Sequence, residues 1–207
     1  MKSQLMMILV IAMSVSCAKQ KDKSKHTDEM LTSIAIPAQT VDQSRLSYDR
    51  KAAVWTLDRN DGIPFSGYAV SFYPDSTLKQ QFGIFNGKKQ STFKAWYPDG
   101  HLKYAANYHQ GKLHGEKKTW SADSSHTLIA HLHYYLGKAH GEQKKWYSSG
   151  EIFQILHLKM GKEEGIQRAF RKNGDLYANY EAKEGRIFGL KKAALCFGLE
   201  DENILHE

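Results

Sequence analysis

The sequence repeats one pattern five times, at a spacing of 24 residues that lengthens once to 26. Each copy opens on an aromatic residue, passes through a turn and an alternating apolar segment, and closes on a glycine. The opening aromatic residues are Phe72, Trp96, Trp120, Trp146 and Phe170, and the closing glycines are Gly87, Gly111, Gly137, Gly161 and Gly185. Both series lengthen in the same copy, which places a two-residue insertion in the loop over residues 121–126. A fixed period of this length predicts a repeat architecture in which each unit stacks on its neighbours.

Within each copy, apolar and polar residues alternate with a period of two. In the second copy, Leu102, Tyr104, Ala106 and Tyr108 fall on one side of this alternation. Such a pattern predicts strands with one face on a core and the other toward water, and turns such as Y-P-D-G separate them. We therefore expect an all-β fold, an elongated single-layer antiparallel meander of β-hairpins. The opening aromatic residues should shield one another in a stripe, and the closing glycines should turn the chain between hairpins.

The N-terminus has the layout of a secretory signal. Lys2 precedes an apolar run from Leu5 to Val15 that is too short to span a bilayer permanently. Residues 14–17 read Ser-Val-Ser-Cys and resemble the lipobox of bacterial lipoproteins, whose cysteine is lipidated and becomes the mature N-terminus. We expect a signal peptide over residues 1–16, a lipid on Cys17 and a location in the bacterial cell envelope. An ordinary signal peptide with an incidental cysteine is the alternative.

Three segments follow the signal peptide. Residues 17–43 are polar and rich in lysine, which predicts a flexible linker after the lipidated cysteine. Residues 44–189 form the predicted repeat domain, and residues 46–57 are expected to be a degenerate first unit. Residues 190–207 begin like a sixth copy and then depart from the pattern, which predicts a C-terminal cap followed by an acidic tail.

The repeated pattern resembles a known family. Residues 96–100, W-Y-P-D-G, and residues 111–115, G-K-L-H-G, are similar to the MORN-repeat variant of bacterial YwqK-type proteins, and the likeness covers roughly residues 62–189. The resemblance implies a binding or scaffolding module. The YwqK-type label further implies the antitoxin of a toxin–antitoxin pair, which captures a toxic partner. This sequence departs from the family in its lipid-anchor signal and its tail, and an immunity role in the envelope agrees with the anchor.

The motifs predict a protein that is not an enzyme and holds no cofactor. The sequence contains no nucleophile elbow, phosphate-binding loop or dinucleotide fingerprint. Asp75, Asp99 and Asp123 recur at turn positions, where aspartate is favoured by local hydrogen bonds. One such residue per hairpin predicts a row along an edge rather than a converging catalytic pair.

The ten histidines raise the question of a metal site. His131 and His133 lie two apart on one predicted strand, and His109 lies one copy earlier. Cys196 is the only thiol besides the lipidation site. Two imidazoles and a thiolate suit copper or zinc, so His131, His133 and Cys196 are the candidate ligands of a metal-handling alternative.

Other observations argue against a metal site. His114 and His140 occupy the same repeat position, which indicates that they were copied with the unit. The sequence also has no H-E-x-x-H, C-x-x-C or EF-hand spacing. The prediction is therefore that the protein has no metal site.

A basic residue follows every closing glycine. These residues are Lys88, Lys112, Lys138, Lys162 and Arg186. The formal net charge is +7, and removal of residues 1–16 takes away Lys2 and leaves +6. Further basic residues that could extend a positive edge or face are Lys117, Lys118, Lys144, Lys145 and Arg168.

Two interpretations of the basic residues stay open. They form either a solvated surface that discourages edge aggregation or a contact for an anionic partner, whose binding would weaken with salt. We expect the partner to be another protein and not nucleic acid, with the membrane reached through the lipid anchor. A module that lies on anionic lipid is the alternative.

Overall fold

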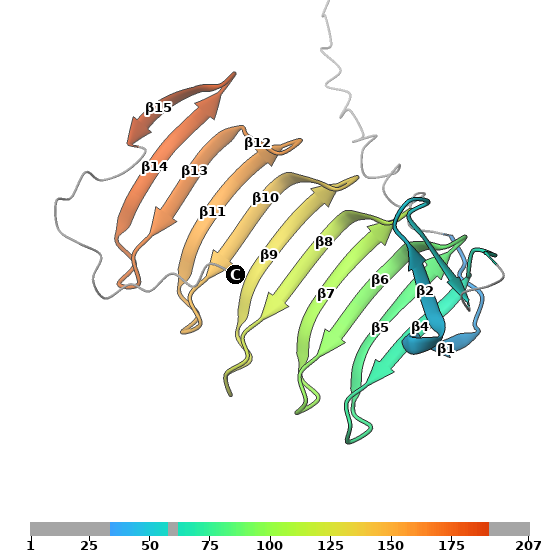
Figure 1. Cartoon of the computed structure of the whole chain (residues 1–207). Coiled ribbons are helices and arrows are strands. Elements are labelled where there is room, and N and C mark those ends of the chain that lie inside the picture. Colours follow the sequence, from blue (N-terminus) through green and yellow to red (C-terminus); the bar gives the residue numbers. More distant parts are fainter. Residues whose placement is uncertain (1–33, 58–61, 191–207) are drawn as a thin grey trace, which may run out of the picture.

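The computed structural model describes residues 34–57 and 62–190 of the chain (Figure 1). The predicted signal peptide, Cys17, Cys196 and residues 191–207 of the predicted cap lie outside this part. The strands are β1 (Thr40–Asp42), β2 (Leu46–Asp49), β3 (Val54–Leu57), β4 (Gly67–Phe72), β5 (Leu78–Phe85), β6 (Lys88–Trp96), β7 (Leu102–His109), β8 (Lys112–Trp120), β9 (Leu128–Tyr135), β10 (Lys138–Trp146), β11 (Ile152–Lys159), β12 (Lys162–Glu163), β13 (Gly165–Phe170), β14 (Leu176–Lys183) and β15 (Arg186–Leu190), with a 3₁₀ helix at Gln43–Arg45. No helix in the described part is long and apolar enough to cross a membrane.

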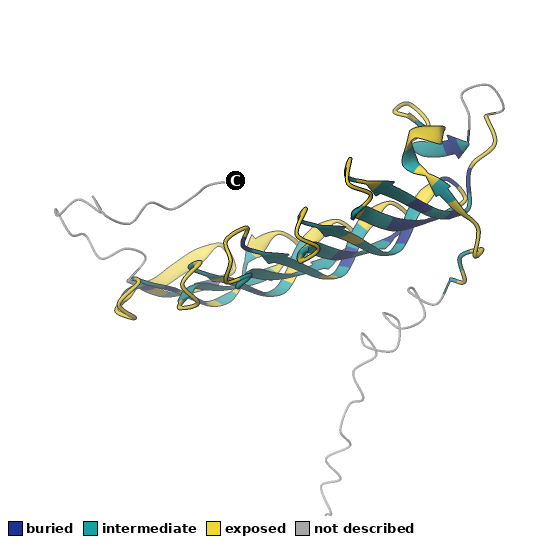
Figure 2. Ribbon diagram, turned by 90° about the horizontal axis from the view of Figure 1, so that it is seen from below, coloured by how far each residue is buried: buried dark blue, intermediate teal, exposed yellow. Residues whose placement is uncertain are grey.

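The main sheet is one long antiparallel meander, which confirms the predicted fold class. Its thirteen strands follow chain order from β4 to β15, with β1 added in parallel at the start and the short β12 paired with β11. Figure 1 shows the strands running side by side along the molecule, and Figure 2 shows the sheet nearly edge-on as a single layer over most of its length.

Two-residue turns join the strands at one edge of the sheet. In each turn both residues have positive φ, 47–53° at the first position and 73–88° at the second. These values define type I′ turns, which match the twist of a hairpin and favour glycine at the second position. The turns are Asn86–Gly87, Gln110–Gly111, Leu136–Gly137, Met160–Gly161 and Glu184–Gly185. The closing glycines are therefore turn residues, as expected.

Longer turns join the strands at the opposite edge, where they protrude in Figure 1. In the second copy, Tyr97 N–H donates to the carbonyl of His101 at 2.8 Å, and Asp99 Oδ1 accepts the backbone N–H of His101 at 2.9 Å. The corresponding turn of the next copy runs from Ser121 to Thr127. The insertion therefore lies in this loop, and the aspartate has the local role that the sequence predicted.

A β-bulge follows the type I′ turn in the first four copies, whereas β14 and β15 pair in regular register. The residue four positions after the closing glycine has positive φ in every copy, at Ser91, Gly115, Gly141, Gly165 and Gly189. In two copies a glutamine side chain pairs with the backbone that the bulge leaves open. The Gln143 side-chain amide donates to the carbonyl of His133 at 2.8 Å and accepts its N–H at 3.3 Å. Gln167, fully buried, does the same with His157 at 2.8 and 2.9 Å.

The cross-strand register sorts the side chains into two faces, because directly paired residues point the same way. The apolar face carries the row Phe93, Ala106, Lys117, Leu132, Gln143 and Leu156. The polar face carries the row Lys94, Ala105, Lys118, His131, Lys144, Ile155, Arg168 and Asn179. The pairing of Tyr104 with Thr119 and of Thr119 with Ala130 confirms the predicted alternation in the second and third copies.

The strands β2 and β3 form a separate hairpin that stands on one end of the sheet (Figure 2). They therefore do not continue the meander as the expected degenerate first unit. Trp55 of β3 packs on Phe82, with ring centroids 5.9 Å apart, and Leu46 joins the buried cluster of Phe65, Ala69, Phe82 and Ile84. The hairpin packs on the sheet as a second layer because this position buries these apolar side chains.

The segment before β2 lies on the other side of the same strands. β1 pairs with β4, and Tyr68 N–H donates to the carbonyl of Gln39 at 2.8 Å. A Cβ on Gly83 would lie 2.3 Å from Ile36 Cδ1 and 2.7 Å from the carbonyl oxygen of Gln90, so the absence of a side chain here leaves room for both the segment and β6. Residues 34–43 were expected to be linker. The sheet thus begins upstream of residue 44.

The opening aromatic residues occupy equivalent places at the longer turns. Each pairs across the hairpin with an aliphatic residue, in the pairs Phe72–Leu78, Trp96–Leu102, Trp120–Leu128, Trp146–Ile152 and Phe170–Leu176. Ring-to-ring contacts follow another path, through Tyr48, Trp55, Phe82, Phe93 and Tyr104. This arrangement differs from the expected stripe, because the opening residues of successive copies are separated by two strands, about 10 Å.

A tyrosine hydroxyl ties neighbouring copies together. It belongs to the first turn residue of one copy and donates to the carbonyl of the aromatic residue that opens the next. The bonds are Tyr73 to Trp96 at 2.8 Å, Tyr97 to Trp120 at 2.8 Å and Tyr147 to Phe170 at 3.0 Å. Ser121 occupies this position in the third copy, and its hydroxyl bonds within its own loop to Asp123.

Candidate partner-binding surface

The five residues after the closing glycines form one basic row along the edge of type I′ turns. Each is the first residue of the strand that leaves its turn, and each is exposed. The members of this basic row are Lys88, Lys112, Lys138, Lys162 and Arg186. Adjacent members are two strands apart, about 10 Å, which is close to the screening length at physiological salt. The structure therefore brings all five predicted residues to one edge.

The charges of the basic row are not neutralised by neighbouring strands. Among the described residues, none of the five forms an ion pair. Lys162 pairs across its turn with Lys159, and Arg186 pairs with Lys183. A second cation thus lies beside Lys162 and beside Arg186, at hairpin ends that also contain Glu163, Glu164 and Glu184.

The other predicted basic residues divide between the two faces. Lys118, Lys144 and Arg168 lie in the polar row, whereas Lys117 and Lys145 pair with Leu132 and Ala130 on the apolar face. The expectation that these residues share one edge or face is therefore wrong, because adjacent strand residues point oppositely.

Two lysines of the polar face are already partnered. Lys118 Nζ lies 2.6 Å from Glu116, and Lys144 Nζ lies 2.7 Å from Glu142. The lysine hydrogen bond lowers the pKa of each glutamate. These pairs reduce the net charge of the polar face and leave the edge as the stronger anion-attracting feature.

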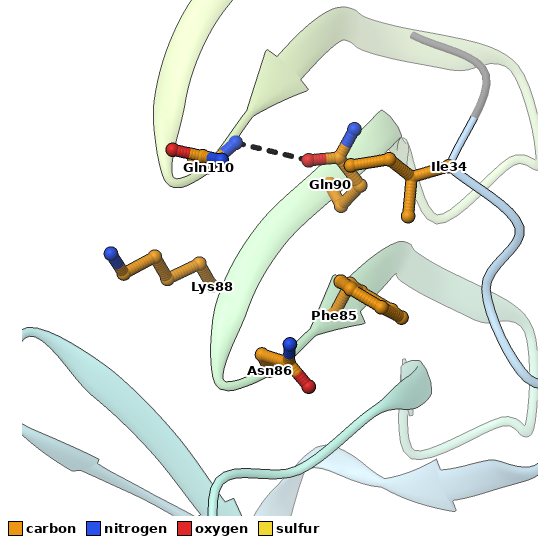
Figure 3. A pocket seen from close by; sticks show the side chains of 6 residues that line it. All are labelled: Ile34, Phe85, Asn86, Lys88, Gln90 and Gln110. Atoms are coloured by element: carbon orange, nitrogen blue, oxygen red, sulfur yellow. Dashed lines mark hydrogen bonds between the residues drawn. The ribbon is translucent and has the colours of Figure 1, made fainter. Parts of the chain in front are cut away.

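Two small hollows adjoin the first member of the basic row. One, of about 230 Å³, is lined by Ile34, Phe85, Asn86, Lys88, Gln90 and Gln110 (Figure 3). The other, of about 270 Å³, lies under the β2–β3 hairpin beside Trp55 and Lys89. Both volumes fall below the range of ordinary small-molecule sites. Extended surfaces are therefore the better candidates for binding in the described part of the chain.

The histidines that recur in the repeat have a structural role. His114 Nδ1 accepts the backbone N–H of Leu136 at 3.4 Å, and His140 Nδ1 accepts that of Met160 at 3.3 Å. Gln90 Oε1 accepts the N–H of Gln110 at 3.0 Å from the same repeat position. Each acceptor fixes the first residue of the next type I′ turn, which explains why histidine was copied with the unit.

His131 and His133 lie together on the polar face, as predicted from their spacing. Their ring centroids are 4.7 Å apart. The third group beside them is Glu116 of β8, whose Oε1 lies 3.2 Å from His131 Nε2 and 3.9 Å from His133 Nε2. Burial lowers the pKa of His131. His109 is elsewhere, buried against Gln90. Glu116 has no signal in the sequence, because only the strand register pairs it with His133.

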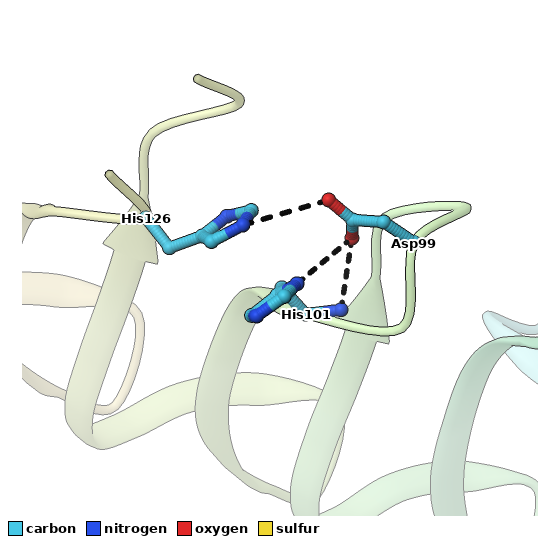
Figure 4. Close-up of side chains that lie close together, drawn as sticks. All are labelled: Asp99, His101 and His126. Carbon is cyan, nitrogen blue, oxygen red and sulfur yellow. Dashed lines mark hydrogen bonds and ion pairs between the residues drawn. The ribbon is translucent and has the colours of Figure 1, made fainter. Parts of the chain in front are cut away.

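A second cluster lies at the edge of longer turns (Figure 4). The inserted loop brings His126 onto His101, with ring centroids 3.5 Å apart and planes 13° apart. Asp99 bridges them, with Oδ1 3.3 Å from His101 Nδ1 and Oδ2 3.5 Å from His126 Nε2. The backbone N–H of His101 and the nearby imidazoles lower the pKa of Asp99. This contact joins the second and third copies.

Comparison with known proteins identifies the repeat. Residues 86–110 and 139–160 match the family described as MORN repeat variant. The two matches contain the β6–β7 and β10–β11 hairpins, whereas the copy between them carries the inserted loop. No curated protein and no solved structure gives a significant match. This chain is thus a β-hairpin repeat protein that contains repeats of the MORN variant type.

Proposed function

We propose that this protein is a non-catalytic scaffold of the bacterial cell envelope, anchored by a lipid on Cys17, that binds another protein through the basic row. The observation that carries the proposal is the alignment of five exposed cations along one edge, none of them in an ion pair with another described residue. Repeat proteins of this extended kind commonly use a continuous surface for binding.

The spacing of the basic row suggests the chemistry of the partner. Members about 10 Å apart match every third residue of a polyproline II segment, which has three residues per turn and advances about 3.1 Å per residue, so that these residues share one side. A segment in this conformation with recurring Asp or Glu fits the five cations of the row. The resemblance to YwqK-type proteins gives the narrower form of the proposal, in which the segment belongs to a toxic protein and the scaffold acts as its antitoxin or immunity partner.

The test compares two triple variants of the full-length lipidated protein in detergent. Lys112→Ser/Lys138→Ser/Lys162→Ser removes the centre of the basic row. Lys79→Ser/Lys94→Ser/Lys103→Ser is the control, because it removes the same charge from other exposed positions. The probe is an unstructured peptide with glutamate at every third residue, followed by fluorescence anisotropy at low and high salt.

We expect the row variant to lose at least about tenfold in affinity and the control to retain the unaltered protein's value, with binding that weakens steeply as salt rises. Equal losses in both variants would refute the role of the row.

Vesicles of anionic phospholipid serve as a second probe. If vesicles bind through the row and the peptide does not, the membrane-apposed alternative replaces the proposal. A Cys17→Ser variant that stays in the membrane fraction would refute the lipid anchor.

A further inference from the structure

We propose that Glu116, His131 and His133 form a zinc-binding site on the polar face. One ligand atom from each residue lies within 4.8 Å of the others, and Glu116 Oε1 lies 3.2 Å from His131 Nε2 and 3.9 Å from His133 Nε2. The residues come from the adjacent strands β8 and β9, in the middle of the sheet. Rigid neighbouring strands hold the three groups close together without the help of a loop. The site is independent of the proposed contact along the basic row.

The hydrogen bonds around the cluster leave the required lone pairs free. His133 Nδ1 lies 2.7 Å from the carbonyl oxygen of Glu142. A carbonyl oxygen only accepts, so Nδ1 carries a proton, and in the neutral imidazole Nε2 then presents its lone pair toward Glu116. This is the arrangement in which metal-binding histidines are usually fixed by an outer carbonyl.

Glu116 is held in a similar way. Its Oε2 is 2.6 Å from Lys118 Nζ, which leaves Oε1 directed at the imidazoles. His131 Nε2 is buried and faces Glu116 Oε1 at 3.2 Å. A proton can hold an imidazole nitrogen beside a carboxylate oxygen, and a bound metal ion takes the place of that proton.

The distances fit zinc. Ligands 2.0–2.1 Å from a tetrahedral Zn²⁺ are about 3.3 Å apart, and Glu116 Oε1 is 3.2 and 3.9 Å from the Nε2 atoms of His131 and His133. Two histidines and one glutamate are a known zinc ligand set that leaves the fourth position open. The side chain of His133 is about one-third exposed, so water can occupy that position.

The next copy contains the same arrangement without one ligand. Glu142 pairs with Lys144 at 2.7 Å and lies 3.9 Å from His157, whose Nδ1 contacts a carbonyl at 2.7 Å. Ile155 replaces His131 at the corresponding place in the polar row. Glu142 and His157 thus provide an internal comparison, with two of the three ligand types of the proposed zinc site. The cluster of Asp99, His101 and His126 is less suited, because its imidazole planes are stacked face to face and its two carboxylate oxygens face different rings.

The first experiment titrates Zn²⁺ into the metal-stripped full-length protein in detergent, by isothermal calorimetry at neutral pH. We expect one equivalent to bind, and we expect His131→Ile to weaken that binding by about 100-fold or more, since even outer-shell changes cost 10–100-fold. His157→Ala and His126→Ala are the matched controls and should leave the affinity unchanged. Absence of zinc binding, or equal binding by His131→Ile, would overturn the proposal.

A gain of binding provides a second test that does not depend on loss. Ile155→His completes the set of Glu142 and His157, and it should raise the stoichiometry from one Zn²⁺ to two. Co²⁺ in place of Zn²⁺ should give the intense visible absorption of tetrahedral coordination, and this band should disappear in His131→Ile. An Ile155→His protein that still binds one equivalent would show that the ligand set is insufficient.

Discussion

At the scale of single residues, the bulge position shows how the repeat uses glycine. Gly115 has φ of 85°, and Ser91 occupies the equivalent place with φ of 67°. A Cβ on Gly115 would lie 3.5 Å from the nearest side-chain atom, so space is available there. The cost of a side chain at this position is therefore conformational rather than steric crowding by neighbours.

We predict that Gly115→Ala lowers the free energy of unfolding by about 1 kcal/mol, because left-handed backbone costs an L-residue 1–2 kcal/mol. Urea denaturation followed by circular dichroism measures the change. Ser91→Ala is the control and should be nearly neutral, since a Cβ is present at that position before and after the substitution. A Gly115→Ala protein as stable as the unaltered one would contradict the argument.

The pKa of Tyr180 gives a prediction for alkaline pH. Burial, together with a 2.8 Å hydrogen bond to Glu163, raises the pKa of Tyr180 to about 12, from an ordinary value of 10.0. The unfolded chain therefore loses this proton first, and stability should fall as pH rises from about 10 to about 12. Tyr180→Phe should remove this part of the decline. Melting temperatures of both proteins across that range test it, because the other groups titrate in both.

At the scale of elements, the tyrosine hydroxyl bond links one hairpin to the next. We predict that Tyr97→Phe destabilises the protein by about 1 kcal/mol, the usual net value of one hydrogen bond, because it frees the carbonyl of Trp120. Chemical denaturation measures this loss. Tyr48→Phe, at an exposed ring on Trp55, should change stability much less, and an equal effect of both would show that the bond between copies contributes nothing.

The hairpins themselves could be predicted from the sequence, because period, turn residues and alternation all act locally. The 24-residue spacing, the turn role of Gly111 and the insertion at residues 121–126 agree with the structure. The departure of the β2–β3 hairpin could not be predicted, since Trp55 and Leu57 alternate like any strand. The position of this hairpin depends on a contact between residues distant in sequence, namely the packing of Trp55 on Phe82.

The candidate sites likewise divide into features that local sequence predicts and features that depend on strand pairing. The basic row follows from a residue that recurs after every closing glycine, and it was found from the sequence. Glu116 was missed because it joins His133 through the register of β8 and β9, which spans 17 residues of chain. Lys117 and Lys118 lie on opposite faces because adjacent residues of a strand alternate. This separation could be predicted from the two-residue period of the sequence.

At the scale of the whole molecule, apolar burial is concentrated at the N-terminal end. The β2–β3 hairpin covers Phe82 and Ile84 on one face, and Ile36 packs at Gly83 on the other. Toward the C-terminus the described buried apolar side chains are small, namely Ala169, Ala178 and Ala182. In a stack where each unit contacts only its neighbours, local stability follows these local interfaces.

Amide hydrogen exchange should therefore be slowest in β5 and β6 and faster in β14 and β15. We predict that Gly83→Val, which collides with Ile36 and with the carbonyl oxygen of Gln90 in β6, speeds exchange in β1 and β4–β6 and leaves β13–β15 unchanged. The reason is that each copy opens against its own neighbours at a cost set by those contacts. Exchange followed by mass spectrometry of peptides resolves these strands. A uniform acceleration along the whole sheet would instead show that the thirteen strands unfold as one cooperative unit, in which the N-terminal layers stabilise the most distant hairpin as much as the nearest.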